Sequence, residues 1–330
     1  MTTTRPRHAA IALIAAGALA LSACAADLPG GSAEQSDYPT RAIDLVLPFG
    51  AGGATDLAAR AMAEALSTEL GQPFNATNQT GAQQVTAVSN VVGSAGDGYT
   101  LLADGGGSST VQSLLPDLPY AWDDRTFIAR VASGAHAYAV GAGSGITTIE
   151  QLEEKAAADP SSFRVAWLSG TSTSDFATLQ LLQAIGVDPA EVIRVPFSGS
   201  GDAMQAAAAG DVDLASGGTS AIASLYSSGD LVPLALTGAD PNYPDLPLTA
   251  ELGYPELDMT YWVGLSGPAS LDDSVVETLA GTLEQLGEEG ALDDSFQTLG
   301  MTVDIVTGEE LDTRVHEEAQ TFGELNALVS

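Results

Sequence analysis

The sequence predicts an α/β fold built mostly from parallel strands, and three observations support this prediction. Short runs of β-branched and apolar residues are each followed by a loop of Gly, Ser and Thr, and then by helical periodicity. The chain has 330 residues, enough for two domains and for a core that needs no disulfide. With 45% hydrophobic residues, its composition is that of a globular protein.

The first strand–loop–helix unit begins near the N-terminal end of this pattern. Residues 43–49 are expected as a strand, 50–55 as a loop and 56–70 as a helix. Gly71 suits the position just after a helix, and Pro73 prevents the helix from continuing. The order strand, glycine-rich loop, helix therefore sets the plan for the rest of the chain.

The same plan recurs further along the chain. Three more units are expected, with strands at 74–79, 163–168 and 192–197 and helices at 82–92, 175–185 and 202–209. Further strands are expected at 99–103, 212–215 and 231–237, and further helices at 272–286 and 308–325. Strands that alternate with helices of this length form βαβ units, which favours parallel pairing.

The N-terminus has the features of an export signal. Arg5 and Arg7 precede an apolar stretch, residues 9–21, that is too short to span a bilayer comfortably. The stretch ends in Leu21-Ser22-Ala23-Cys24, which matches a bacterial lipobox, and Cys24 is the only cysteine. We predict that residues 1–23 are removed, that acyl chains such as palmitate on Cys24 anchor the protein to the cell membrane, and that 24–37 is a flexible tether. The alternative is an ordinary signal peptide in which Cys24 has no role.

Charge and composition exclude several functions. The chain carries 43 acidic against 10 basic residues, a net charge of −33, which argues against binding nucleic acid. A single cysteine rules out an intramolecular disulfide. His136 and His316 are expected to be structural or solvated residues, so no metal site, cofactor or Ser-His-Asp triad is expected.

The loops that follow the strands are the candidate binding elements. In open α/β sheets, ligands bind beyond the carboxyl ends of the strands, at the start of the next helix. The first turn of a helix offers unpaired N–H groups and a partial positive charge, so it can hold an anion without Lys or Arg. None of these loops matches a nucleotide-binding motif.

Several short motifs, in order along the chain, resemble those of one family. They are Leu-Pro-Phe-Gly-Ala-Gly-Gly-Ala-Thr-Asp at 47–56, Asn-Gln-Thr-Gly-Ala at 78–82, Asp-Gly-Tyr-Thr-Leu at 97–101 and Val-Pro-Phe-Ser-Gly at 195–199. This series is similar to the receptors of tripartite tricarboxylate transporters, the TctC-like or Bug solute-binding proteins. The resemblance covers residues 38–330.

The resemblance implies a two-lobed periplasmic-binding-protein fold, type II-like, with the ligand in the cleft between lobes. Lobe one is then 38–128 plus 239–330, and lobe two is 129–238. It also implies that the ligand is held partly through backbone amides, among them those of Gly52, Gly53, Gly81 and Ala82. The ligand-binding residues that it implies are Phe49, Ala51, Gly52, Gly53, Thr55, Asp56, Thr80, Gly81, Ala82, Gly170, Thr171, Ser172, Ser174, Phe197, Ser198 and Gly199.

Two departures from the family pattern bear on the ligand. The family's Gly-Ala-Gly-Gly run appears here as Gly81-Ala82-Gln83-Gln84, so two side chains replace two glycines and narrow the pocket or add a polar contact. Phe197 stands where Tyr is common, which removes a hydroxyl. The identity of the ligand stays open.

The resemblance implies a non-catalytic, monomeric, extracytoplasmic receptor. It would capture a small organic carboxylate and deliver it to a permease with one large and one small membrane subunit. Two alternatives remain at this point: a secreted lipoprotein hydrolase that uses a loop serine, and a sensor that presents its ligand to a membrane kinase.

Overall fold

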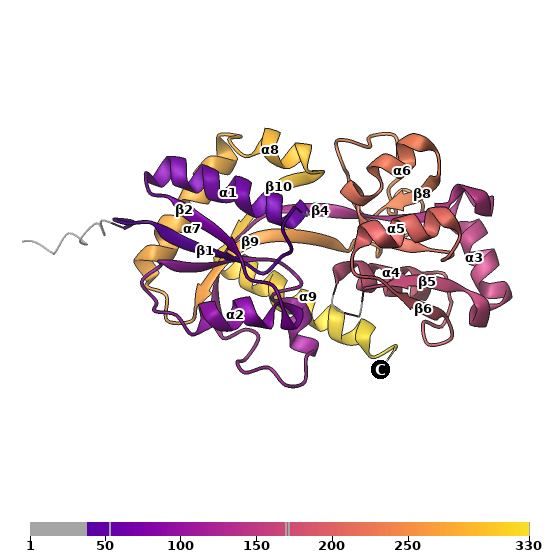
Figure 1. The fold of residues 1–330 in the computed structure, drawn as a ribbon, viewed down its shortest axis with the longest axis horizontal. Coiled ribbons are helices and arrows are strands. Elements are labelled where there is room, and N and C mark those ends of the chain that lie inside the picture. Colours follow the sequence, from indigo (N-terminus) through magenta and orange to yellow (C-terminus); the bar gives the residue numbers. More distant parts are fainter. Residues whose placement is uncertain (1–37, 53, 169, 171, 330) are drawn as a thin grey trace, which may run out of the picture. The chain divides into compact units, whose positions relative to one another are not determined.

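A computed structural model describes residues 38–52, 54–168, 170 and 172–329 (Figure 1). The predicted signal peptide, Cys24 and the tether therefore lie outside the described residues. Within the described part of the chain, no helix is both long and apolar enough to cross a bilayer.

The largest element is a sheet of eight strands, six of which follow one another in the order β10-β4-β9-β3-β1-β2. In β1, Ile43, Leu45 and Leu47 are fully buried on one face, whereas on the other face Asp44 is exposed and Val46 is buried. The six strands are β1 (Ile43–Leu47), β2 (Phe74–Asn78), β3 (Thr100–Asp104), β4 (Arg125–Gly141), β9 (Thr260–Pro268) and β10 (Met301–Thr307). The helices beside them in sequence are α1 (Ala54–Leu70), α2 (Val85–Val92), α7 (Asp273–Glu288) and α8 (Asp293–Thr298).

The long strand β4 extends from these six strands into the other half of the protein. Its residues from Arg125 to Ala135 pair with β9, whereas those from His136 onward pair with β7 (Ala215–Gly218) and β8 (Leu231–Leu236). A separate two-stranded parallel sheet contains β5 (Arg164–Trp167) and β6 (Ile193–Pro196). The remaining helices are α3 (Ile149–Ala158), α4 (Thr173–Ala184), α5 (Ser200–Ala209), α6 (Ala223–Ser228) and α9 (Gly308–Asn326).

The prediction of mostly parallel strands is wrong. β1 pairs in parallel with β2 and β3, but β9 runs antiparallel to β3 and β4, and β10, β7 and β8 all run antiparallel to β4. The reason is that β4, β9 and β10 were absent from the expected elements. β4 contains the run Val-Ala-Ser-Gly-Ala at 131–135, whose small residues lack the β-branched signature of a strand.

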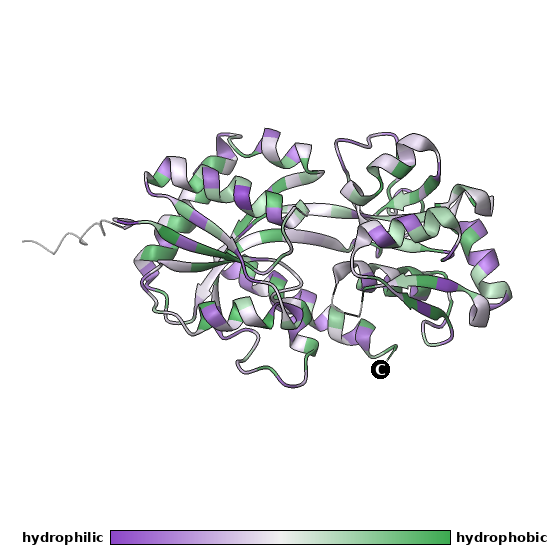
Figure 2. Ribbon diagram, viewed as in Figure 1, coloured by the Kyte–Doolittle hydropathy of each residue, from purple (hydrophilic) through white to green (hydrophobic). Residues whose placement is uncertain are grey.

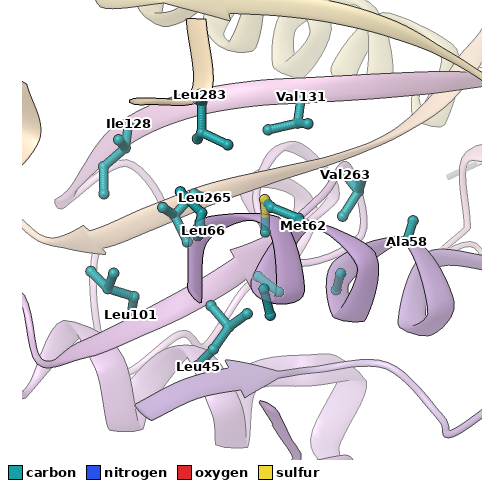
Figure 3. Close-up of a cluster of buried hydrophobic side chains, with 14 of the residues drawn as sticks. Leu45, Ala58, Met62, Leu66, Leu101, Ile128, Val131, Val263, Leu265 and Leu283 are labelled. Atoms are coloured by element: carbon teal, nitrogen blue, oxygen red, sulfur yellow. The ribbon is translucent and has the colours of Figure 1, made fainter. Parts of the chain in front are cut away.

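The described residues form five hydrophobic clusters, and the two largest cores agree with the predicted two-lobed α/β fold. The first core packs α1 and α7 against the central strands, with Leu45, Met62 and Leu283 among its members (Figure 3). The second includes Phe163, Phe176 and Phe322, and the rings of the last two stack with centroids 4.4 Å apart. Hydrophobic residues follow the strands in both halves, while polar residues are concentrated on the outer helices (Figure 2). Each buried Leu or Phe contributes about 1.5–3 kcal/mol.

The lobe boundaries at 128/129 and 238/239 stay a prediction. β4 exchanges its partners between Ala135 and His136. Near its C-terminal end, α9 places Phe322 and Leu325 in the second core, together with Leu257 and Met259.

Candidate ligand-binding site

A cavity of about 760 Å³ opens where the loops of the two halves face each other. Its size lies in the range of small-molecule sites. The walls come from the starts of α1, α4 and α5, from the loop after β3, and from β4 and β9. The lining residues are Phe49, Gly52, Ala54, Thr55, Leu57, Gln84, Gly105, Gly106, Gly107, His136, Leu168, Ser172, Thr173, Ser174, Ser198, Ser200, Gly201, Gly218, Ser220, Ala221, Tyr261, Trp262, Thr298 and Leu299.

The loop after β1 is held by a buried carboxylate. Asp56, in the first turn of α1, accepts hydrogen bonds from Gly52 N (2.9 Å), Asn78 Nδ2 (2.7 Å) and Arg60 Nε (3.2 Å). Burial alone would raise the pKa of Asp56, but these hydrogen bonds outweigh it and hold that pKa below its usual value. Asp56 therefore fixes the loop rather than facing the cavity, and the Gly52 amide is occupied by it.

The second lobe repeats this arrangement at the loop after β5. Asp175, in the first turn of α4 and 1% exposed, accepts from Leu168 N (2.6 Å) and Gly170 N (2.8 Å). Each half of the cavity thus has a strand-end loop fixed by an aspartate of the following helix. Such fixed loops hold their remaining amides in place before a ligand arrives.

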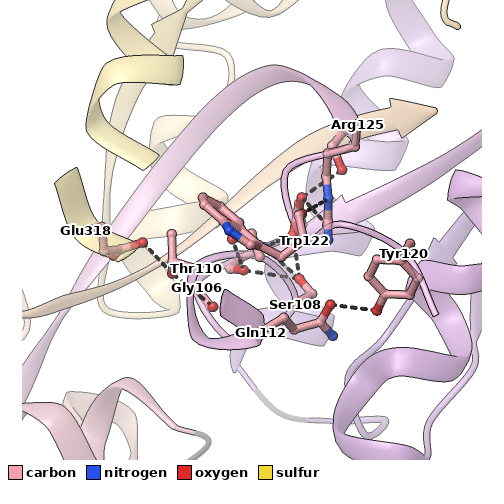
Figure 4. Close-up of polar contacts among 12 residues, drawn as sticks. Gly106, Ser108, Thr110, Gln112, Tyr120, Trp122, Arg125 and Glu318 are labelled. Carbon is pink, nitrogen blue, oxygen red and sulfur yellow. Dashed lines mark hydrogen bonds and ion pairs between the residues drawn. The ribbon is translucent and has the colours of Figure 1, made fainter. Parts of the chain in front are cut away.

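A third loop, after β3, is anchored by a buried ion pair (Figure 4). Asp104 contacts Arg125 at 3.2 Å with both side chains about 1% exposed, and it also accepts from the hydroxyls of Ser108 (2.5 Å) and Ser266 (2.7 Å). This anchoring positions Gly105, Gly106 and Gly107 at the cavity wall. A Cβ on Gly105 would lie 2.7 Å from the Trp262 carbonyl oxygen, so glycine is needed for this close approach.

The indole of Trp262 is held by a hydrogen bond to a carboxyl group. Glu318 of α9 accepts from Trp262 Nε1 at 3.1 Å. It also accepts from Thr110 Oγ1 at 2.7 Å (Figure 4). Burial raises the pKa of Glu318, and these hydrogen bonds offset the rise only in part. The contact sets the orientation of an aromatic ring in the cavity wall.

His136 lies in the cavity wall at the point where β4 changes partners. It is 1% exposed, its Nε2 lies 3.0 Å from Thr173 Oγ1 and its Nδ1 3.5 Å from Ser174 Oγ. Burial lowers the pKa of His136 to about 4, against a smaller rise from a hydrogen bond with the Gly217 backbone. The imidazole is therefore neutral at physiological pH.

The cavity is electrically unusual for so acidic a chain. Among its described lining residues there is no Lys, Arg, Asp or Glu. The starts of α1, α4 and α5 contribute lining residues, and helix starts carry partial positive charge. Within the described chain, the amides of Gly106 and Gly107 have no hydrogen-bond acceptor. These features suit an anion held by amides and hydroxyls rather than by a basic side chain.

A strained turn forms one corner of the cavity. The helix expected at 82–92 begins only at Val85, because Ala82, Gln83 and Gln84 adopt left-handed φ angles of 46°, 54° and 71°. Each left-handed non-glycine residue costs about 1 kcal/mol or more, and such strain concentrates at functional sites. The Gln84 side chain lines the cavity, whereas Gln83 is exposed.

Of the predicted site residues, the structure places Phe49, Gly52, Thr55, Ser172, Ser174 and Ser198 on the cavity wall. Ala51, Asp56, Thr80, Gly81, Ala82, Gly170, Phe197 and Gly199 lie in the same loops but do not line it. Asp56 and Gly170 take part in loop anchoring, and Phe197 packs against the core cluster around Met204. Gly53, Thr171 and Cys24 lie outside the described residues.

Sequence reasoning missed several lining residues. The run Gly-Gly-Gly-Ser-Ser-Thr at 105–110 follows the expected strand 99–103 and satisfies the strand-end rule, so it could have been found. His136 and Trp262 gave no comparable signal, because they lie inside long strands.

Comparison with known proteins places the chain among solute-binding receptors. Residues 58–326 match the family described as "Tripartite tricarboxylate transporter family receptor". The chain is 28% identical to Protein BugT of Bordetella pertussis over 290 residues, 86% of this chain and 88% of that protein. A Rhodopseudomonas palustris protein solved with adipate is 26% identical, with a TM-score of 0.76 over 88% of this chain and 98% of the other. MatC of the same species, solved with bound malate, is also 26% identical, with a TM-score of 0.72 over 87% and 99%.

Proposed function

The chain belongs to the tripartite tricarboxylate transporter receptor family, as its motifs predict, and we propose that it captures a small organic carboxylate outside the cytoplasm. The observation that carries this proposal is the cavity wall, where free glycine amides and helix starts stand without any charged side chain among the described lining residues. A carboxylate is one of the anions that such a wall suits.

The ligand class is supported by the solved relatives. Adipate and malate, with which two of the similar proteins were solved, are both small dicarboxylates. The cavity of about 760 Å³ has room for acids of this size together with water. A small di- or hydroxycarboxylate is therefore the class that we propose for this chain.

We further propose that the protein delivers its ligand to a membrane permease with one large and one small subunit, and its membership of the receptor family supports this proposal. The anchor on Cys24 would keep the receptor at the membrane surface, where the permease lies. Uptake of radiolabelled ligand should be lost when the gene is deleted and restored by the wild-type gene. A sensor would instead leave uptake intact and change transcription.

The geometry of the cavity gives little support to the alternative that the protein is a hydrolase. Ser174 Oγ lies 3.5 Å from His136 Nδ1, which is the one serine–histidine pair among the described lining residues. A histidine with a pKa of about 4 is a weak base, and no carboxylate among its described contacts orients it. We therefore propose that the protein binds without catalysis.

The test is a binding screen on the soluble chain that begins at residue 38. Thermal shift against di- and tricarboxylates, aromatic acids and amino acids identifies a ligand, and calorimetry gives its affinity. Gly106→Ala, whose Cβ would lie 2.9 Å from Thr173 Cγ2, should weaken binding about tenfold or more, whereas Gly143→Ala, with open space around its Cβ, should not. The proposed ligand class is wrong if only amino acids bind, and the proposed carboxylate receptor function fails if none of these acids binds.

A further inference from the structure

We propose that Gln84 recognises a hydroxyl group on the bound acid, so that the receptor prefers hydroxycarboxylates to their unsubstituted counterparts. This inference rests on the proposed function, because it takes the cavity to hold a small carboxylate. It concerns the residue at which the chain departs from the family's Gly-Ala-Gly-Gly run.

The position of the side chain is the first argument. Gln84 is the one carboxamide among the described lining residues. It lies across the loop after β3, since a Cβ on Gly107 would be 2.6 Å from Gln84 Nε2. It is therefore beside the free amides of Gly106 and Gly107, which are candidate donors to a carboxylate.

The oxygen of this carboxamide lacks a hydrogen-bond partner in the described protein. Gln84 Oε1 is buried and has no hydrogen bond within the described protein. A buried acceptor left unpaired is unfavourable, and most such atoms in folded proteins are satisfied. A ligand that donates a hydrogen bond to Gln84 Oε1 would remove this penalty once the carboxamide turns this shielded oxygen toward the cavity.

The backbone that carries Gln84 is held in place despite its strain. Gln112, which is fully buried, donates from Nε2 to the carbonyl of Gln83 at 3.3 Å and accepts from Tyr120 Oη at 2.7 Å (Figure 4). The left-handed φ of 71° at Gln84 would suit glycine better. A side chain kept at such a position points to a functional use.

The chemistry of the amide selects the ligand group. A carboxamide offers a donor and an acceptor at one end, whereas an ionised carboxylate only accepts. A hydroxyl both donates and accepts, so it matches the amide. An ammonium group also donates, but no acidic side chain among the described lining residues would balance its charge. The hydroxyl is therefore favoured over the amine.

Calorimetry with matched pairs of acids tests the inference. The pairs are malate with succinate, 2-hydroxyglutarate with glutarate, and 3-hydroxyadipate with adipate, each differing by one hydroxyl. For the pair that binds most tightly, the wild-type protein should prefer the hydroxy acid by about tenfold or more, the usual effect of one buried hydrogen bond and its unpaired partner. Gln84→Met, which keeps the length of the side chain, should lower this ratio to less than about threefold.

Two further variants control for folding and for backbone strain. Gln84→Gly relieves the left-handed strain and should also abolish the preference, so a poorly folded Gln84→Met protein would not prevent the test. Gln83→Met makes the same exchange on the same left-handed turn, at an exposed side chain outside the cavity, and should keep the wild-type ratio.

The outcomes separate this inference from the proposed function. If the wild-type protein binds acids without preferring the hydroxy member, or if both Gln84 variants keep the preference, the inference is wrong and the receptor function stands. The same holds if Gln83→Met loses the preference as fully as the Gln84 variants. If no acid binds at all, the proposed function fails and this inference falls with it.

Discussion

Replacing Asp56 by Ala should both destabilise the protein and weaken ligand binding, because this one carboxylate fixes the loop after β1. Asp56 is 2% exposed and accepts from the Gly52 amide and from Asn78 Nδ2, at 2.9 and 2.7 Å. Arg60 adds a contact at 3.2 Å, but its side chain is 41% exposed, so solvent screens that contact and its contribution is small.

The magnitude follows from the two hydrogen bonds that the buried Asp56 accepts from Gly52 and Asn78. A hydrogen bond to a charged group contributes about 1.5–3 kcal/mol, so losing both should lower the free energy of unfolding by about 3 kcal/mol at pH 7. Ligand affinity should fall about tenfold or more, since Gly52, Ala54 and Thr55 lose the anchor that positions them. Asp44→Ala is the matched control, because Asp44 is exposed on β1 and its side chain has no partner in the described protein.

Urea unfolding at several pH values provides the assay. The folded-state pKa of Asp56 is lowered, so its contribution is present above the unfolded value near pH 4 and is lost as pH falls through the folded value. The difference in free energy of unfolding between the wild-type and Asp56→Ala proteins should therefore shrink as the pH falls. A difference that widens as the pH falls, or an Asp56→Ala protein as stable as Asp44→Ala, would refute this account of the loop.

Three further predictions concern titration, ligand charge and the anchor. Burial lowers the pKa of His136 to about 4, below the unfolded value of about 6.5. Between pH 6.5 and 5 the free energy of unfolding of the wild-type protein should therefore fall by about 1 kcal/mol or more beyond any fall seen for His136→Gln. Parallel pH profiles of the two proteins would contradict this. The methyl ester or amide of the identified ligand should bind about 100-fold more weakly than the acid, because charge-assisted hydrogen bonds are lost; equal affinities would argue against a carboxylate site. Cys24→Ser, at a residue outside the described structure, should move the full-length protein from the membrane to the soluble fraction, and persistent membrane association together with no acyl labelling of the wild-type protein would disprove the lipid anchor.

The sequence reveals those parts of the fold that follow local rules. β1 and α1 were predictable because Ile43, Leu45 and Leu47 alternate with other residues and Gly71 follows the helix. β4 was not, because its small residues are needed by partners that are distant in sequence. A Cβ on Gly134, for example, would lie 2.2 Å from the ring of Tyr261. Because β4 and β9 were absent from the expected strands, the sheet was predicted to be mostly parallel although it is mixed.

The same division applies to the site. Loops that follow strands could be identified because strand ends and helix starts meet at one edge, and Phe49, Ser172 and Ser198 do line the cavity. His136 and Trp262 reach it from inside strands, and their exposure to the cavity depends on how the two lobes face each other. No local pattern encodes that arrangement.

A crystal structure of the protein with its identified acid would test the central claim most directly. We predict that a ligand carboxylate lies within hydrogen-bond distance of the Gly106 or Gly107 amide or of the first turn of α1, with α4 or α5 residues on its other side. A ligand bound outside this cavity, or one whose carboxylate pairs with an arginine or lysine side chain, would contradict the claim that amides and helix starts hold the anion.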